Sequence, residues 1–129
     1  MSVMRYIGAM ATRVPTEMQE QIALASWLRK RGIWFCHPPN EGRRSRRQGA
    51  QLRAAGLMSG VPDILIFDRA PGAPDASGVA IELKRVNGRP SQVSANQRTW
   101  LEALEIRGWK VHVAYGCEDA VEWLTSLGY

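Results

Sequence analysis

The sequence predicts an α/β domain in which helices flank a mixed central β-sheet, with elements in the order α-β-β-β-α-β-α. Apolar runs of strand length lie in the middle of the chain, capping patterns mark helix starts before and after them, and an alternating segment lies near the carboxyl end. The chain has 129 residues, of which 45% are hydrophobic, and this is enough for one core. We therefore expect residues 1–129 to form a single domain.

The first expected element is a helix over residues 16–31. Thr16 and Gln19 have the spacing of a capping box, in which a hydroxyl and a reciprocal amide satisfy free donors at a helix start. Gly32 marks the end of the helix. Residues 1–13 show no clear period, so we expect a loosely ordered arm that could pack on a second subunit. The expected apolar stripe of the helix is Met18, Ile22, Leu24, Ala25 and Leu28.

Three strands are expected next, at 33–37, 63–67 and 79–84. The first is aromatic and stops at the Pro38-Pro39 pair, and a turn rich in Pro and Gly at 71–75 separates the other two. Residues 51–55 could form a short helix before Gly56. The rest of the segment between the first two strands is expected to be a loop.

The last three elements follow a second capping box. Ser94 and Gln97 open a helix that ends near Gly108. Residues 110–115 alternate as a strand, and residues 118–127 carry a final helical stripe.

The cysteines and tryptophans are interpreted as structural. Cys36 and Cys117 lie far apart, without a CxxC pair or a histidine cluster, which argues against a zinc site or a disulfide framework. We expect both to be small core residues. The tryptophans are expected mainly in the core or in an interface: Trp27, Trp34, Trp100, Trp109 and Trp123.

The charge balance favours a polyanionic partner. Seventeen Lys and Arg against twelve Asp and Glu give a net charge of +5, although a solvated basic surface is the alternative. Several arginines are concentrated in a stretch with no acid after Glu41, and we expect them to bind DNA phosphates: Arg43, Arg44, Arg46, Arg47 and Arg53. No apolar run approaches the roughly 20 residues of a membrane span, so we expect a soluble, cytoplasmic protein without a membrane partner.

Two acids and a lysine stand where a metal-dependent phosphodiesterase would need them. Glu82 and Lys84 are two apart on one expected strand and therefore point to the same face, while Asp63 begins the neighbouring strand. Both carboxylates could bind one hard cation, with the Leu83 carbonyl as a further ligand. Lys84 would orient the attacking water. The alternative is a structural ion pair, which the same residues could form.

The residues around this set resemble the VRR-NUC family of nucleases, within the PD-(D/E)XK superfamily. The resemblance covers about residues 16–116. It is carried by Gly60-Val61-Pro62-Asp63, Ile81-Glu82-Leu83-Lys84, Ser94-Ala95-Asn96-Gln97, Trp100-Leu101 and the His37–Gly42 loop.

The resemblance implies a restriction-endonuclease-like core and an endodeoxyribonuclease that depends on Mg²⁺ or Mn²⁺. It implies catalytic roles for Asp63, Glu82 and Lys84, a metal-ligating acid on the first helix at Glu17, and a role for Gln97. Two other residues on that helix, Glu20 and Gln21, are held in reserve for the same role. His37 is interpreted as a hydrogen-bonded structural residue rather than a catalytic one.

Small members of the family suggest a homodimer that selects branched DNA, such as four-way (Holliday) junctions, in a bacterial or phage-infected cell. A repair or restriction-type nuclease acting on flaps or linear duplex is one alternative. The other is a nucleic-acid-binding module without catalysis.

Overall fold

The structure is a computed structural model, and it describes residues 13–39 and 45–129. Within them the chain forms α1 (Glu17–Lys30), β1 (Phe35–Cys36), α2 (Arg46–Ala54), β2 (Ile64–Ile66), β3 (Val79–Lys84), a 3₁₀ turn η2 (Pro90–Gln92), α3 (Ala95–Ile106), β4 (Lys110–Tyr115) and α4 (Cys117–Ser126). The predicted order is therefore confirmed, with α2 as a full helix between β1 and β2.

The four strands form one mixed sheet in the order β1-β2-β3-β4. The pairings β1–β2 and β2–β3 are antiparallel, whereas β3 and β4 are parallel and are connected through α3. In this register Ile64 lies opposite Ile81, and Glu82 lies opposite Val113. The α/β class with a mixed sheet is confirmed.

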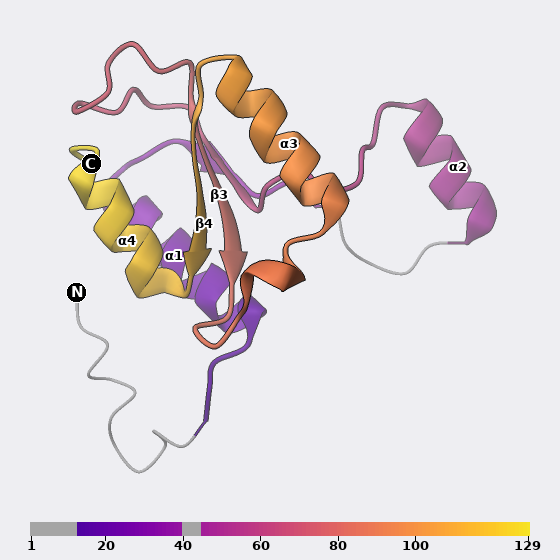
Figure 1. The fold of residues 1–129 in the computed structure, drawn as a ribbon, viewed down its shortest axis with the longest axis horizontal. Coiled ribbons are helices and arrows are strands. Elements are labelled where there is room, and N and C mark those ends of the chain that lie inside the picture. Colours follow the sequence, from indigo (N-terminus) through magenta and orange to yellow (C-terminus); the bar gives the residue numbers. More distant parts are fainter. Residues whose placement is uncertain (1–12, 40–44) are drawn as a thin grey trace.

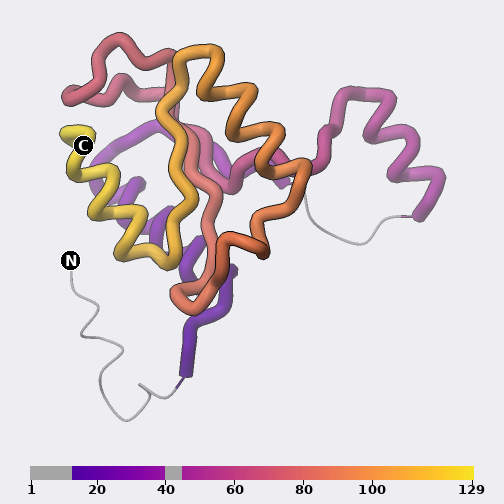
Figure 2. The backbone as a smooth tube through the Cα atoms, viewed as in Figure 1, coloured from indigo at the N-terminus to yellow at the C-terminus, as the bar shows by residue number. Residues whose placement is uncertain are grey.

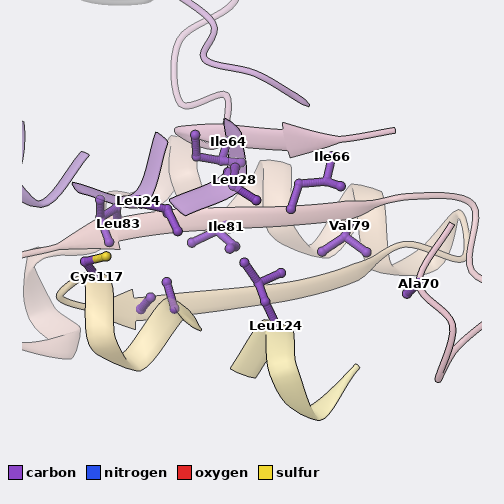
Figure 3. Packing of buried hydrophobic residues seen from close by; sticks show 12 residues of the cluster. Leu24, Leu28, Ile64, Ile66, Ala70, Val79, Ile81, Leu83, Cys117 and Leu124 are labelled. Carbon is purple, nitrogen blue, oxygen red and sulfur yellow. The ribbon is translucent and has the colours of Figure 1, made fainter. Parts of the chain in front are cut away.

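Helices cover the sheet unequally. Helices α1 and α4 lie on one face, while α3 lies on the other and contacts β4 (Figures 1 and 2). The hydrophobic core lies between the sheet and the helices α1 and α4, where Leu24 and Leu28 of α1 and Leu124 of α4 pack around Ile81 (Figure 3). Because side chains alternate along β3, Glu82 and Lys84 point to the opposite face, toward the start of α3.

Capping boxes begin three of the helices. The predicted pairs Thr16–Gln19 and Ser94–Gln97 are both present. A third box, Ser45–Gln48, starts α2 at Arg46, well before the expected residue 51. No residue of α2 is buried, and the helix stands away from the rest of the domain (Figure 1).

Several burial predictions were wrong. Cys117 is buried as expected, but Cys36 is exposed, because the two-residue strand β1 turns Phe35 toward the core and Cys36 away from it. Trp34, predicted in the core or in an interface, does not lie in the core, since it is 76% exposed for the same reason. Met18 and Ile22 are also exposed, since the face of α1 that contacts the sheet is formed by Glu20, Gln21, Leu24, Ala25 and Leu28.

Parts of two predictions fall outside the described residues: most of the amino-terminal arm, and Arg43 and Arg44 of the arginine cluster. In the part of the chain that the structure describes, no helix has the length and apolar character needed to cross a membrane.

Candidate active site

Asp63 lies directly before β2, and a backbone contact to the next strand holds its side chain. Its Oδ2 accepts a hydrogen bond from the Leu83 amide of β3 at 2.7 Å. The Asp63 carbonyl accepts a hydrogen bond from His37 Nδ1 at 2.6 Å. His37 is thus a hydrogen-bonded residue at the end of β1, in agreement with its structural interpretation, and it fixes the backbone from which the Asp63 carboxylate projects.

Glu82, Lys84 and Gln97 form one hydrogen-bonded group. Gln97 Nε2 donates to Glu82 Oε2 at 2.9 Å, and Lys84 Nζ donates to Gln97 Oε1 at 3.2 Å. Lys84 Nζ also lies 3.4 Å from Glu82 Oε2. Glu82 is 2% exposed and Lys84 is 7% exposed, so their contact is shielded from water.

The capping box of α3 holds Gln97 in this position. The same Oε1 that receives Lys84 also accepts a hydrogen bond from the Ser94 amide at 2.8 Å, while the Gln97 amide donates to Ser94 Oγ. Gln97 therefore joins the first turn of α3 to the two charged residues of β3.

The charged form of the Glu82 carboxyl group is disfavoured at this position. Desolvation by burial and, next, the charge of Asp63 raise the pKa of Glu82 from 4.5 to about 8, although Lys84 opposes the shift. Its Oε1 is buried and has no hydrogen-bond partner among the residues that the structure describes. Two neighbouring carboxylates with an unsatisfied buried oxygen are an environment in which an added cation would be stabilised.

An open cleft of about 60 Å³ lies at Asp63, between α1 and the β2–β3 edge, and we call it the acidic cleft. Its lining residues are Glu17, Met18, Gln21, His37, Asp63 and Leu83. The first helix thus presents Glu17 and Gln21 to the same cleft as Asp63.

Glu20 points elsewhere. Its Oε1 accepts a hydrogen bond from the Cys117 amide at 3.0 Å, at the start of α4. The structure therefore separates Glu20 from Glu17 and Gln21, although all three share one helix.

The predicted residues converge only in part. Across residues 13–39 and 45–129, no three His, Cys, Asp or Glu side chains form a group that could hold a metal ion. Glu17 lines the acidic cleft without forming such a group with Asp63 and Glu82. The arginines of the predicted cluster that the structure describes, Arg46, Arg47 and Arg53, are exposed on α2.

Sequence reasoning missed the role of Arg85, the residue after Lys84. Its guanidinium donates to the carbonyls of Pro15 at 3.1 Å and Val14 at 3.0 Å, which lie just before α1. The contact fastens the start of the helix that carries Glu17 to the end of β3. A basic residue directly after a catalytic lysine was the available signal, but its partners lie 70 and 71 residues away in the chain.

Comparison with known proteins identifies the family. Residues 15–118 match the model of the VRR-NUC domain. A solved structure described as "VRR_NUC domain protein" aligns with a TM-score of 0.71 and 22% identity, covering 89% of each chain, and this likeness concerns the fold. No match was found among the curated proteins. Because the domain match spans most of the chain and contains Asp63, Glu82, Lys84 and Gln97, the protein belongs to the VRR-NUC domain family, with its nuclease-type fold.

Proposed function

We propose that this protein is a metal-dependent DNA endonuclease that hydrolyses phosphodiester bonds at the acidic cleft. The observation that carries the proposal is the closeness of Asp63, Glu82 and Lys84, which come from two adjacent strands, with Asp63 lining that cleft. Membership of the VRR-NUC family supports nuclease chemistry. The net charge of +5 supports a polyanionic substrate.

The oxygen donors suit a hard divalent cation. Glu82 Oε1 is buried without a partner in the described part of the chain, and Asp63 is close enough to raise the pKa of Glu82, so a cation held by these two residues would relieve both effects. Mg²⁺ commonly takes one or two carboxylates and keeps water or phosphate oxygens as its other ligands. We propose Asp63, Glu82 and the Leu83 carbonyl as ligands of Mg²⁺ or Mn²⁺, with Glu17 completing the set from α1.

When bound there, the cation would neutralise charge on the phosphoryl oxygens and favour ionisation of a water molecule. Lys84 orients the attacking water and stabilises negative charge on the phosphoryl group, since its ammonium is held in place by Gln97 and Glu82. An ammonium beside a carboxylate suits this role better than proton abstraction. Gln97 acts on Glu82 and Lys84 as a positioning residue.

We propose branched DNA, such as a four-way junction, as the preferred substrate of a homodimeric enzyme. Two copies of the site would make the paired cuts that resolution of a junction needs. The exposed arginines of α2, Arg46, Arg47 and Arg53, with no acid among residues 45–62, supply cations for backbone phosphates beyond the cleft.

The direct test is cleavage of labelled four-way junction, flap and linear duplex DNA with Mg²⁺ or Mn²⁺. We expect Asp63→Asn and Glu82→Gln to abolish cleavage, and Lys84→Met to reduce it by a factor on the order of 10² to 10³. Asp75→Asn, a change to an exposed acid in a remote turn, is the matched control and should cut like the wild type.

The outcomes separate the alternatives. Preferential cleavage of flap or linear duplex DNA would support the nuclease activity but contradict the four-way junction as the preferred substrate. Salt-dependent DNA binding without cutting in either metal would favour a non-catalytic binding module. Undiminished cutting by Asp63→Asn or Glu82→Gln would place the active site elsewhere.

A further inference from the structure

A second polar pocket, of about 360 Å³, opens next to the acidic cleft. We call it the arginine pocket, and its lining residues are Glu17, Arg85, Asn87, Arg89, Ser91 and Gln92. Apart from Glu17, all of them belong to the segment that follows Lys84 directly in the chain. Glu17 lines both the pocket and the cleft, so the two are neighbours.

The lining of the pocket suits an anionic oxygen ligand. Two arginines and one glutamate line it, and an asparagine, a serine and a glutamine add neutral hydrogen-bonding groups. Arg89 forms no ion pair with any residue that the structure describes. Because guanidinium groups match the geometry of phosphate oxygens, a phosphodiester is the ligand class that this lining would recognise.

The segment that forms the pocket is held by hydrogen bonds and by close contact with β3 and β4. Arg85 is held by its two hydrogen bonds to the backbone ahead of α1. Gly88 lies so close to the catalytic strand that a Cβ there would be 3.1 Å from the Lys84 Cβ and 3.1 Å from Tyr115 Cδ1. The Arg89 amide donates to Gln92 Oε1 at 2.8 Å, which closes the turn at η2. A preformed pocket loses little conformational freedom when it binds.

We propose that the arginine pocket binds a backbone phosphate of the substrate about one or two nucleotides from the scissile phosphate, with Arg89 as its main charged contact. Successive phosphates of one strand are about 3.4 Å apart along a duplex axis, so a strand in the acidic cleft has further phosphates within reach of the adjoining pocket. The inference rests on the proposed function, and it assigns the arginine pocket a role in setting the register of the DNA strand.

The test combines protein variants with neutral phosphates. Wild-type cleavage products first locate the scissile bond. Single methylphosphonates are then placed at each of about three phosphates on either side, and binding is measured by fluorescence anisotropy over a range of salt concentrations. All proteins in the binding assay carry Asp63→Asn, so that the DNA stays intact. In this Asp63→Asn background we compare Arg89→Gln, Arg89→Lys and the control Arg107→Gln, which lies at the far end of α3.

We expect one methylphosphonate, at the next or next-but-one phosphate, to weaken binding about tenfold when Arg89 is present. Arg89→Gln should remove that sensitivity, Arg89→Lys should retain part of it, and Arg107→Gln should retain all of it. Arg89→Gln should also lower the slope of log K against log salt by about 0.9. Because the Arg89 side chain is exposed, the thermal midpoints of the variants should agree.

The proposal is overturned if Arg89→Gln binds like Arg107→Gln, or if it keeps the full sensitivity at every phosphate. Failure of the proposed function would give a different result. It is seen in the first step, when the wild type cuts none of the DNA substrates, and the arginine pocket then loses its assigned role as well.

Discussion

Glu82 is almost fully buried on β3, beside a second carboxylate and an ammonium that offsets only part of the charge. Its pKa is raised by burial first and by Asp63 second. At neutral pH the folded protein without a bound cation therefore holds a proton that the unfolded chain has released. Folding stability must then depend on pH through this residue.

We predict that, in EDTA, the free energy of unfolding falls as pH rises from about 4.5 toward about 8. A raised carboxyl pKa contributes stability that is complete below the unfolded value and is lost as pH approaches the folded value. Glu82→Gln removes the titration, so the free energy of unfolding of the variant should rise relative to that of the wild type by roughly 1–3 kcal/mol between pH 5 and pH 8. Urea unfolding followed by tryptophan fluorescence measures the difference.

The matched control for this prediction is Glu102→Gln, which changes an exposed acid on α3. It should follow the wild type at every pH. A Glu82→Gln curve parallel to that of the wild type would show that Glu82 does not titrate in this range in the folded protein.

At this scale, the candidate site could be predicted where local spacing determines it. Glu82 and Lys84 share a face because they are two apart on a strand, and Gln97 is recognisable because it closes a capping box. The partners of Arg85 could not be predicted, because they depend on how distant parts of the chain meet. The orientation of Glu20 could not be predicted for the same reason: helical spacing places it near Glu17, but packing against α4 turns its side chain away.

Among the elements, α1 and α4 are connected by Glu20. Helix α4 begins at Gly116 without a side-chain cap of its own, and the Cys117 amide donates to Glu20 instead. Glu20 is 2% exposed, so the hydrogen bond is protected from water. A carboxylate at the amino terminus of a helix also interacts favourably with the helix dipole.

We therefore predict that Glu20→Ala lowers the free energy of unfolding by about 1–3 kcal/mol, and that Glu20→Gln, which keeps an acceptor, costs less. Glu118→Ala, at an exposed position in the first turn of α4, is the control and should cost less than Glu20→Ala. DNA cleavage well below the melting temperature should be unaffected by Glu20→Gln. Loss of cleavage in a stably folded Glu20→Gln protein would instead support Glu20 as a metal ligand.

Helix α2 has no buried residue, and three arginines lie on it. Replacing Arg46, Arg47 and Arg53 together by glutamine should leave thermal stability unchanged but weaken DNA binding. The slope of log K against log salt should fall by about 0.9 for each phosphate contact that is lost. Binding titrations at several salt concentrations measure this, and an unchanged slope would contradict a role for α2 in binding the DNA backbone.

A control for charge alone is available near the amino ends of β3 and β4, away from the end of β3 that carries Glu82 and Lys84. Glutamine at Arg69, Arg107 and Lys110 removes the same number of cations from exposed positions away from the cleft. This triple variant should keep a salt slope close to that of the wild type.

The extent of each element could be predicted where its ends carry a local signal. Capping boxes determine the starts of α1 and α3, and glycines follow both helices. The predicted bounds of β3 and β4 agree with the structure. Strand β1 is shorter than its aromatic sequence suggested, since an edge strand extends only as far as β2 pairs with it. The third capping box was present in the sequence, but the helix that it begins has no buried residue and therefore no apolar stripe to predict it by.

For the whole molecule, the sheet is covered unevenly. Helix α3 covers the β4 side of one sheet face, and the described helices leave the β1–β2 side of that face uncovered. Trp34 and Phe67 lie there and are 76% and 60% exposed. The two residues are cross-strand neighbours, since the Phe67 amide donates to the Trp34 carbonyl at 3.0 Å. Large exposed apolar side chains on one face are typical of an association surface.

We predict a dimer in solution, with about twice the 14.4 kDa mass of the chain by light scattering. The double change Trp34→Ser and Phe67→Ser should shift it to a monomer, because it removes apolar area from the contact. Ile106→Ser, at an 83% exposed position at the end of α3, should not. A monomeric wild type would contradict the homodimer, and a dimeric double variant would place the contact on another surface.

One side-chain amide serves two structures, because Gln97 closes the first turn of α3 and also bridges Glu82 to Lys84. Fraying of that turn would therefore also break the hydrogen bonds from Gln97 to Glu82 and from Lys84 to Gln97, whereas the direct contact between Lys84 and Glu82 does not depend on Gln97. Amide hydrogen exchange at the start of α3 would report how often these bridges are broken, and a cation held by Glu82 and Asp63 would slow that exchange.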